Sequence, residues 1–230
     1  MLTTPQLLQQ GQSTLKGASD LVSAVQNELQ ANPGAYDAEH PLTIFGYSQG
    51  AAVASIAMTE LAKDGVPLGD LHFVLLGDPG LPGGAWPNVE AAFIDWLGPG
   101  LANFVFELLD LKPILGLLTP TDLYPTTIYT LEGDGVAEFQ KDWESGGGGF
   151  NGLMSVLNGF TNQHGEYLGL TSSEIANSTV TTDGNLTLVQ ISDDLDNQAA
   201  HQAQSLVTAD GGQFDALLGS LLFAFTHIVL

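Results

Sequence analysis

The 230-residue sequence contains no cysteine and no arginine, and four lysines are its only strongly basic side chains. Without cysteine the chain has neither disulfide bonds nor a thiolate nucleophile. Its 26 acidic side chains give a formal net charge of −22. Nucleic-acid binding needs a basic surface, so this charge excludes nucleic acid as a partner and disfavours anionic lipid headgroups. Neutral esters and glycolipids are compatible with this charge.

Long hydrophobic runs are also missing. The longest one, Leu217–Leu230, has fourteen residues, whereas a membrane-spanning helix needs roughly 20. We therefore expect no integral membrane segment, and we interpret this run as a buried or interfacial helix. The first twelve residues lack the basic start and apolar centre of a secretory signal, so no signal peptide is predicted.

The remaining pattern indicates one α/β domain over residues 1–230, with a hydrophobic content of 44%. Apolar residues at helical spacings predict a helix over Pro5–Gln30. Buried strands are predicted at Leu42–Phe45, Leu71–Gly77 and Thr126–Leu131. The strand–helix–strand spacing of the first two predicts a parallel sheet. A hairpin is predicted around Asp183-Gly184, and residues 197–206 predict a polar helix.

One motif organises the chain. Gly46-Tyr47-Ser48-Gln49-Gly50 has the pattern G-x-S-x-G, and it stands between the strand at Leu42–Phe45 and an alanine-rich helical stretch. A serine at the apex of a strand–turn–helix is typical of the nucleophile elbow of α/β-hydrolases. The helix N-terminus below it offers free N–H groups to a developing oxyanion. The pattern therefore predicts Ser48 as a nucleophile. The alternative is a glycine-rich turn with a solvated serine.

A serine hydroxyl needs a base to take its proton, and the base needs an acid behind it. The chain order in α/β-hydrolases is serine, acid, histidine. His40 precedes Ser48 and is excluded by that order. His72 lies inside a predicted strand, so we interpret it as structural.

Three histidines remain after these two are set aside. His227 stands in the apolar C-terminal run, where a buried core histidine is the usual explanation, and His201 lies on a polar helix and is expected to be solvated. His164 stands in a polar loop beside a glycine, and such loops often carry catalytic side chains. We therefore predict His164 as the base.

Four acidic residues compete for the third position. Asp134 follows a predicted strand and stands between two glycines, which favours it. Asp78 also ends a strand, but the proline after it indicates a turn. Asp122 and Glu132 are weaker candidates.

We expect no metal and no cofactor. The sequence has no H-E-x-x-H pair and no glycine fingerprint for phosphates or dinucleotides. The acidic stretch at residues 193–196 lacks the pattern of a calcium-binding loop, and we interpret it as a solvated turn.

At this point the chain resembles the PE-PPE domain, a cutinase-like serine α/β-hydrolase module of mycobacteria and their relatives. The resemblance covers roughly residues 40–170. It is carried, in order, by FGYSQGA (Phe45–Ala51), LLGDPGLPGGA (Leu75–Ala85), YPTTIYTLEGDGVAEF (Tyr124–Phe139) and NQHGEY (Asn162–Tyr167). The resemblance implies a central parallel sheet flanked by helices.

By position, the resemblance implies Ser48 as nucleophile, Asp134 as acid and His164 as base, and the backbone N–H of Gln49 is expected to donate to the oxyanion. It implies hydrolysis of acyl or lipid esters by a protein of the cell envelope or the secreted space. Two alternatives stay open: an acyltransferase acting on cell-envelope glycolipids, and a weakly active or non-enzymatic remnant of the fold.

Residues 81–122 differ in character, because they are rich in leucine and aromatic residues and poor in charge. One interpretation is an apolar lid or acyl-chain pocket over the serine. The other is a set of helices that pack in the core.

The start of the chain departs from the family pattern. Only the helix Pro5–Gln30 precedes the elbow strand, so the early strand that supplies a second oxyanion donor is missing. We expect an N-terminally shortened domain that is weakly active and prone to aggregate. If the chain is active, we expect the loop Asp78–Gly84 to complete the oxyanion hole.

Overall fold

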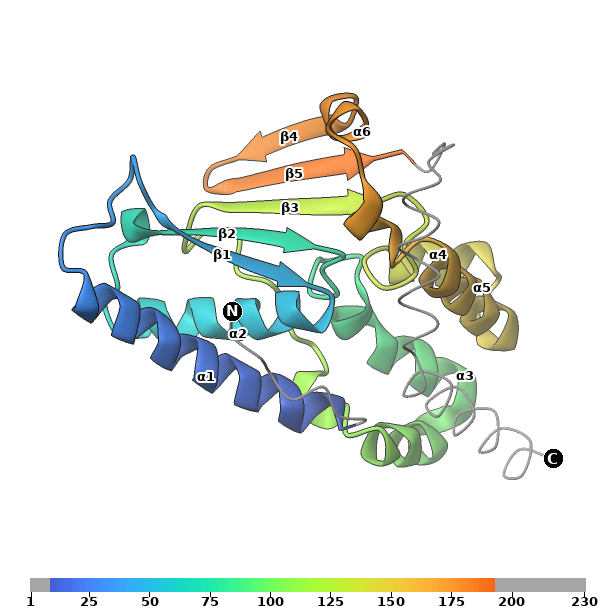
Figure 1. Ribbon diagram of the computed structural model, residues 1–230. Coiled ribbons are helices and arrows are strands. Elements are labelled where there is room, and N and C mark those ends of the chain that lie inside the picture. Colours follow the sequence, from blue (N-terminus) through green and yellow to red (C-terminus); the bar gives the residue numbers. More distant parts are fainter. Residues whose placement is uncertain (1–8, 193–230) are drawn as a thin grey trace.

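The computed structural model describes residues 9–192 (Figure 1). The predicted helices at residues 197–206 and 217–230 lie outside the described residues, as do His201, His227 and the acidic turn at residues 193–196.

Five strands form one sheet in the order β1-β2-β3-β5-β4. They are β1 (Leu42–Tyr47), β2 (Leu71–Leu76), β3 (Thr126–Leu131), β4 (Thr179–Asp183) and β5 (Leu186–Ile191). The first four in this order are mutually parallel, and β4 pairs with β5 antiparallel at the edge. The predicted α/β fold with a central parallel sheet is therefore confirmed. The predicted hairpin is present as β4 and β5, and Gly184 takes a positive φ of 58° at its turn.

The strands are connected mainly by helices. The α-helices are α1 (Gln10–Ala31), α2 (Gln49–Lys63), α3 (Ala85–Leu108), α4 (Phe139–Ser145), α5 (Gly149–Asn162) and α6 (Ser172–Ala176). Three 3-10 turns are η1 (Leu68–Asp70), η2 (Lys112–Ile114) and η3 (Glu166–Gly169). Helix α3 is broken at Gly98, whose φ of 75° is not helical and which precedes Pro99.

Helices α1 and α2 lie together on one face of the sheet (Figure 1). The inner side of α2 is mostly alanine, which lets the helix approach the strands closely. Its buried residues pack in one cluster with Ile44 of β1, Phe73 of β2 and Ile128 of β3. At the carboxyl ends of the strands, Tyr167 of η3 packs on the opposite face in a cluster that includes Leu131.

A second core joins α3, α4 and α5. Its rings meet in pairs, for example Phe93 with Trp143 at 5.8 Å and Phe93 with Phe106 at 6.0 Å between centroids. Such pairs add to the stability that buried area provides. Much of the aromatic and leucine content of residues 81–122 is packed in this cluster.

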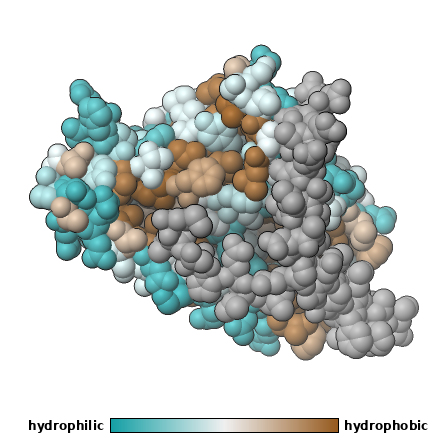
Figure 2. All heavy atoms as spheres, in the orientation of Figure 1, coloured by the Kyte–Doolittle hydropathy of each residue, from teal (hydrophilic) through white to brown (hydrophobic). Residues whose placement is uncertain are grey.

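Strand β1 ends the sheet on one side of the described structure, and its Phe45 side chain is 61% exposed. Figure 2 shows a band of hydrophobic residues across the sheet in this view, next to a hydrophilic region at the left. Among the described helices, none combines the length and hydropathy that crossing a membrane requires.

Two helical glycines allow a test of the packing that holds the loop after β3. A Cβ on Gly159 of α5 would lie 2.4 Å from the backbone oxygen of Gly133 and 2.6 Å from the nitrogen of Gly135, whereas a Cβ on Gly100 of α3 would meet nothing within 4 Å. We expect Gly159→Ala to lower the free energy of unfolding by roughly 1–3 kcal/mol. Gly100→Ala is the control and should raise it by up to about 1 kcal/mol through helix propensity. Urea denaturation measures both, and equal effects would contradict this packing.

Candidate active site

Ser48 lies at the sharp turn between β1 and α2. Its φ of 57° and ψ of −119° place a non-glycine residue in a strained conformation, which costs on the order of 1–3 kcal/mol. The Ser48 N–H donates to the Leu76 carbonyl of β2 at 3.0 Å and so ties the turn to the sheet. A Cβ on Gly46 would lie 2.7 Å from the Gly50 oxygen. Gly46 is therefore needed because strand and helix touch there, whereas a Cβ on Gly50 would meet nothing within 4 Å.

The structure brings together the three residues that the sequence singled out. Ser48 Oγ lies 2.7 Å from His164 Nε2. On the other side of the ring, His164 Nδ1 lies 2.8 Å from Asp134 Oδ1 and 3.0 Å from Oδ2. Asp134 and His164 are both buried. The three side chains thus form a continuous hydrogen-bonded chain from a strained turn to a buried carboxyl group.

The electrostatics of the buried pair fix the direction of these hydrogen bonds. Burial alone would raise the pKa of Asp134, but attraction to His164 and hydrogen bonds from His164, Val136 and Tyr167 outweigh it and hold the pKa below its usual value. An ionised carboxylate only accepts, so His164 Nδ1 carries the proton. In the neutral ring, Nε2 is then the acceptor that faces the Ser48 hydroxyl.

Local backbone structure places the two partners of the serine. Asp134 stands in the turn after β3, where its Oδ1 accepts from the Val136 N–H at 2.9 Å. His164 follows the end of α5, and its N–H reaches the Gly159 carbonyl at 3.3 Å. Between them, Gly77 after β2 has a φ of 55°, and a Cβ there would lie 2.9 Å from His164 Cε1 and 3.1 Å from Asp134 Oδ2. Only a glycine leaves room for this pair.

Aromatic rings enclose the histidine. Tyr47 stacks on His164 with 5.3 Å between centroids, and Phe160 stacks on it at 5.1 Å. The Tyr47 hydroxyl also donates to the His164 carbonyl at 2.5 Å. Tyr167 donates a hydrogen bond to Asp134 Oδ2 at 2.7 Å. Sequence reasoning missed these roles, although Tyr47 lies within the G-x-S-x-G pattern and Tyr167 ends the NQHGEY block.

The competing acids have other partners. Buried Asp78 accepts from the Gly80 N–H at 2.9 Å and from the Thr119 hydroxyl at 2.6 Å. Burial raises the pKa of Asp78 in spite of these two bonds. Glu132 lies 3.3 Å from Lys141 Nζ, and the Asp122 carbonyl accepts from an asparagine side chain.

The two histidines that were set aside also lie elsewhere. His72 Nε2 lies 3.0 Å from the Thr127 hydroxyl on the neighbouring strand. His40 is exposed and lies 3.5 Å from Asp37 Oδ1.

Gln49 is the first residue of α2, so its backbone N–H has no acceptor within the helix. Its side chain ties the elbow to α1, because Nε2 lies 2.7 Å from Ser13 Oγ and 3.0 Å from Gln10 Oε1. In the loop Asp78–Gly84, two N–H groups already donate hydrogen bonds within the loop: that of Gly80 to Asp78 Oδ1 and that of Gly84 to the Leu81 carbonyl.

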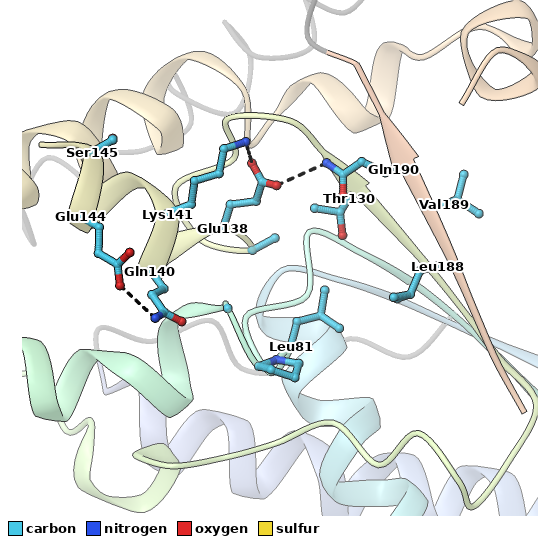
Figure 3. Close-up of a pocket in the computed structure, with 13 residues that line it drawn as sticks. Leu81, Thr130, Glu138, Gln140, Lys141, Glu144, Ser145, Leu188, Val189 and Gln190 are labelled. Atoms are coloured by element: carbon cyan, nitrogen blue, oxygen red, sulfur yellow. Dashed lines mark hydrogen bonds and ion pairs between the residues drawn. The ribbon is translucent and has the colours of Figure 1, made fainter. Parts of the chain in front are cut away.

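A cavity of about 600 Å³ lies apart from these residues (Figure 3). The loop after β2, helix α4 and strand β5 line it, with Leu81 and Leu188 as apolar members, and none of Ser48, Asp134 and His164 does. Its polar groups bind one another: Glu138 pairs with Lys141 at 3.0 Å and accepts from Gln190 at 3.3 Å. Within residues 9–192, no cluster of three or more acidic or histidine side chains is arranged to hold a metal ion.

Relatives of this chain come from Mycobacterium tuberculosis. An uncharacterized PPE family protein, PPE28, is 32% identical over 71% of this chain and 22% of its own length. A protein named Esterase PE16 is 33% identical over 74% of this chain and 28% of its own length. The chain thus spans about a quarter of the length of these curated relatives. No solved structure matches it significantly.

The family comparison covers most of the chain. The model of the PE-PPE domain matches residues 2–189, which include the serine turn, the loop after β3 and the segment after α5. The resemblance that the four sequence blocks carry is therefore confirmed, and the chain belongs to the PE-PPE domain family.

Proposed function

We propose that this chain hydrolyses carboxylic esters of acyl or lipid substrates through an acyl-enzyme formed on Ser48. The observation that carries the proposal is the hydrogen-bonded chain Ser48–His164–Asp134, with Ser48 on a strained turn at the start of a helix. The name of the relative Esterase PE16 supports the same reaction class.

The geometry suits a two-step acyl transfer. As the Ser48 oxygen attacks the ester carbonyl, His164 Nε2 takes the hydroxyl proton, and Asp134 stabilises the imidazolium that forms. The backbone N–H of Gln49 donates to the carbonyl oxygen as it becomes an oxyanion. His164 then gives its proton to the leaving alcohol, which leaves the acyl group on Ser48. A water molecule, deprotonated by His164, releases the acid and restores the serine.

The charge of the chain narrows the substrate class. A net charge of −22 repels anionic lipids and fatty-acid headgroups. We therefore propose neutral acyl esters as substrates, in the cell-envelope or secreted setting that the family resemblance implies. Residues 81–122 are proposed to line the acyl side of the site, through apolar residues of α3 such as the exposed Phe104 and Leu108.

The nucleophile can be tested by covalent labelling. We expect a fluorophosphonate probe to label the wild type and not Ser48→Ala, whose ester hydrolysis should fall to the residual rate that substrate binding and the oxyanion donor support. Ser23→Ala removes an exposed serine of α1 and is the control that should label fully. Labelling of Ser48→Ala at the wild-type rate would refute the assignment.

The space around the His164–Asp134 pair gives a second test. Gly77→Ala and Gly65→Ala both place a side chain at a positive φ, but a Cβ at Gly65 meets nothing within 4 Å. Both should lose roughly 1–2 kcal/mol of stability through backbone strain, and Gly77→Ala should lose more because its Cβ would also crowd the buried pair. Only Gly77→Ala should also lose about 10²-fold in kcat, since it displaces the reacting groups. Steady-state kinetics with p-nitrophenyl esters decides this, and equal kcat values for the two variants would count against the proposed geometry.

A further inference from the structure

We propose that Tyr167 is a positioning residue, whose hydroxyl holds the Asp134 carboxylate in the orientation that engages His164. The inference rests on the proposed ester hydrolysis and adds a fourth member to its hydrogen-bonded chain. Tyr167 lies in η3, which begins at Glu166 shortly after α5 ends at Asn162, and its side chain is buried against the carboxyl ends of the strands.

The hydrogen bonds of the Tyr167 hydroxyl have only one arrangement. The Leu131 N–H lies 2.7 Å from the Tyr167 oxygen, and Asp134 Oδ2 lies 2.7 Å from it on the other side. An amide N–H can only donate, so the hydroxyl oxygen accepts from Leu131. Its single proton is then left for Asp134. The backbone of β3 thereby anchors the phenol, and the phenol anchors the carboxylate.

The two carboxylate oxygens of Asp134 are supported by different segments. Oδ1 accepts from the Val136 N–H at 2.9 Å and from His164 Nδ1 at 2.8 Å. Oδ2 accepts from Tyr167 at 2.7 Å, while His164 Nδ1 lies 3.0 Å away. Without the Tyr167 hydroxyl, Oδ2 would have to accept from the His164 Nδ1–H group, which already donates to Oδ1. Asp134 is fully buried, so bulk water does not replace the lost donor.

The charges around the carboxylate support this role. Burial, followed by the charge of Asp134, raises the pKa of Tyr167 well above its usual value, so the phenol remains a donor throughout the neutral range. The hydrogen bond from Tyr167 is one of the contacts that lower the pKa of Asp134. Asp134 also interacts electrostatically with Tyr47 of β1 and with Asp142 of α4. Burial is the main reason why the pKa of Asp142 is raised to about 6. Glu138 lies in the same loop as Asp134, and its carboxylate accepts from the Gly133 N–H at 2.9 Å.

The test compares two buried tyrosines. Tyr167→Phe removes the donor to Asp134, and Tyr124→Phe removes a buried hydroxyl that donates to the Val66 carbonyl at 3.1 Å in the main core. For Tyr167→Phe we expect kcat to fall roughly ten- to hundredfold with KM unchanged, as for a lost hydrogen bond to a charged group. Tyr124→Phe should keep wild-type kinetics. A kcat for Tyr167→Phe within twofold of the wild type would overturn the proposal.

The pH profile separates positioning from general packing. Loss of the Tyr167 donor raises the pKa of Asp134, so the ionised carboxylate is lost at a higher pH as the solution is acidified. The acid limb of the kcat/KM profile, which belongs to the Asp134–His164 pair, should move to higher pH. A trifluorotyrosine at position 167 keeps the aromatic ring and its hydroxyl donates more strongly, so the acid limb should move to lower pH. This variant tests the proposal independently of whether Tyr167→Phe folds. An unmoved limb in the trifluorotyrosine protein would overturn the proposal.

A double-mutant cycle tests whether Tyr167 acts through Asp134. In an Asp134→Ala background, Tyr167→Phe should cost no further activity, whereas independent losses would multiply and contradict the proposal. Titration of the His164 ring, followed by NMR, measures the ionisation of the Asp134–His164 pair without substrate turnover. Absence of Ser48-dependent hydrolysis would refute the proposed function, while an NMR midpoint unchanged by either change at Tyr167 would refute this inference separately.

Discussion

A fully buried carboxylate is the constraint on which the architecture around Ser48 depends. Removing the charge of Asp134 from water is costly unless donors surround it. Three segments supply them: the turn after β3 through Val136, the end of α5 through His164, and η3 through Tyr167. His164 and Tyr167 stand 30 and 33 positions beyond Asp134 in the sequence, so the carboxylate can stay ionised only when the carboxyl end of the sheet is assembled. The same donors orient it towards the imidazole, which links the stability of this region to its proposed chemistry.

Close backbone approaches make that assembly feasible. Gly46 lets β1 and α2 meet at the serine turn, and Gly77 leaves space for the histidine and the carboxylate. Gly159 lets α5 lie against the loop that carries Asp134. The strain at Ser48, with its φ of 57°, is held by the bond from its N–H to β2 and by the packing of α2 on the sheet. The contacts that position the proposed catalytic residues are therefore the same contacts that hold the strands and helices together at the carboxyl end of the sheet.

Much of the fold and the position of Ser48 could be predicted from the sequence, because each depends on residues that are neighbours along the chain. The strands, the hairpin and the serine turn follow from hydrophobic runs and glycine spacing, and the motif by itself indicates Ser48. The choice between Asp134 and Asp78 was harder, since both follow strands. What separates them is Thr119, which binds Asp78 from 41 positions along the chain. Gly77 and the two tyrosines were not foreseen because their roles exist only when β1, β2 and η3 are brought together. Their catalytic and positioning roles remain proposals.

The central claim is that Ser48 carries the acyl group, and the most direct measurement is to observe it there. Mixing the protein with a p-nitrophenyl ester, quenching within milliseconds and digesting it allows the acylated peptide to be identified by mass. We predict an adduct of the acyl mass on the peptide that contains Ser48, with a burst of p-nitrophenolate equal to the enzyme concentration if deacylation limits turnover. An adduct on another residue, or ester turnover that continues at the wild-type rate when Ser48 is replaced by alanine, would contradict the account.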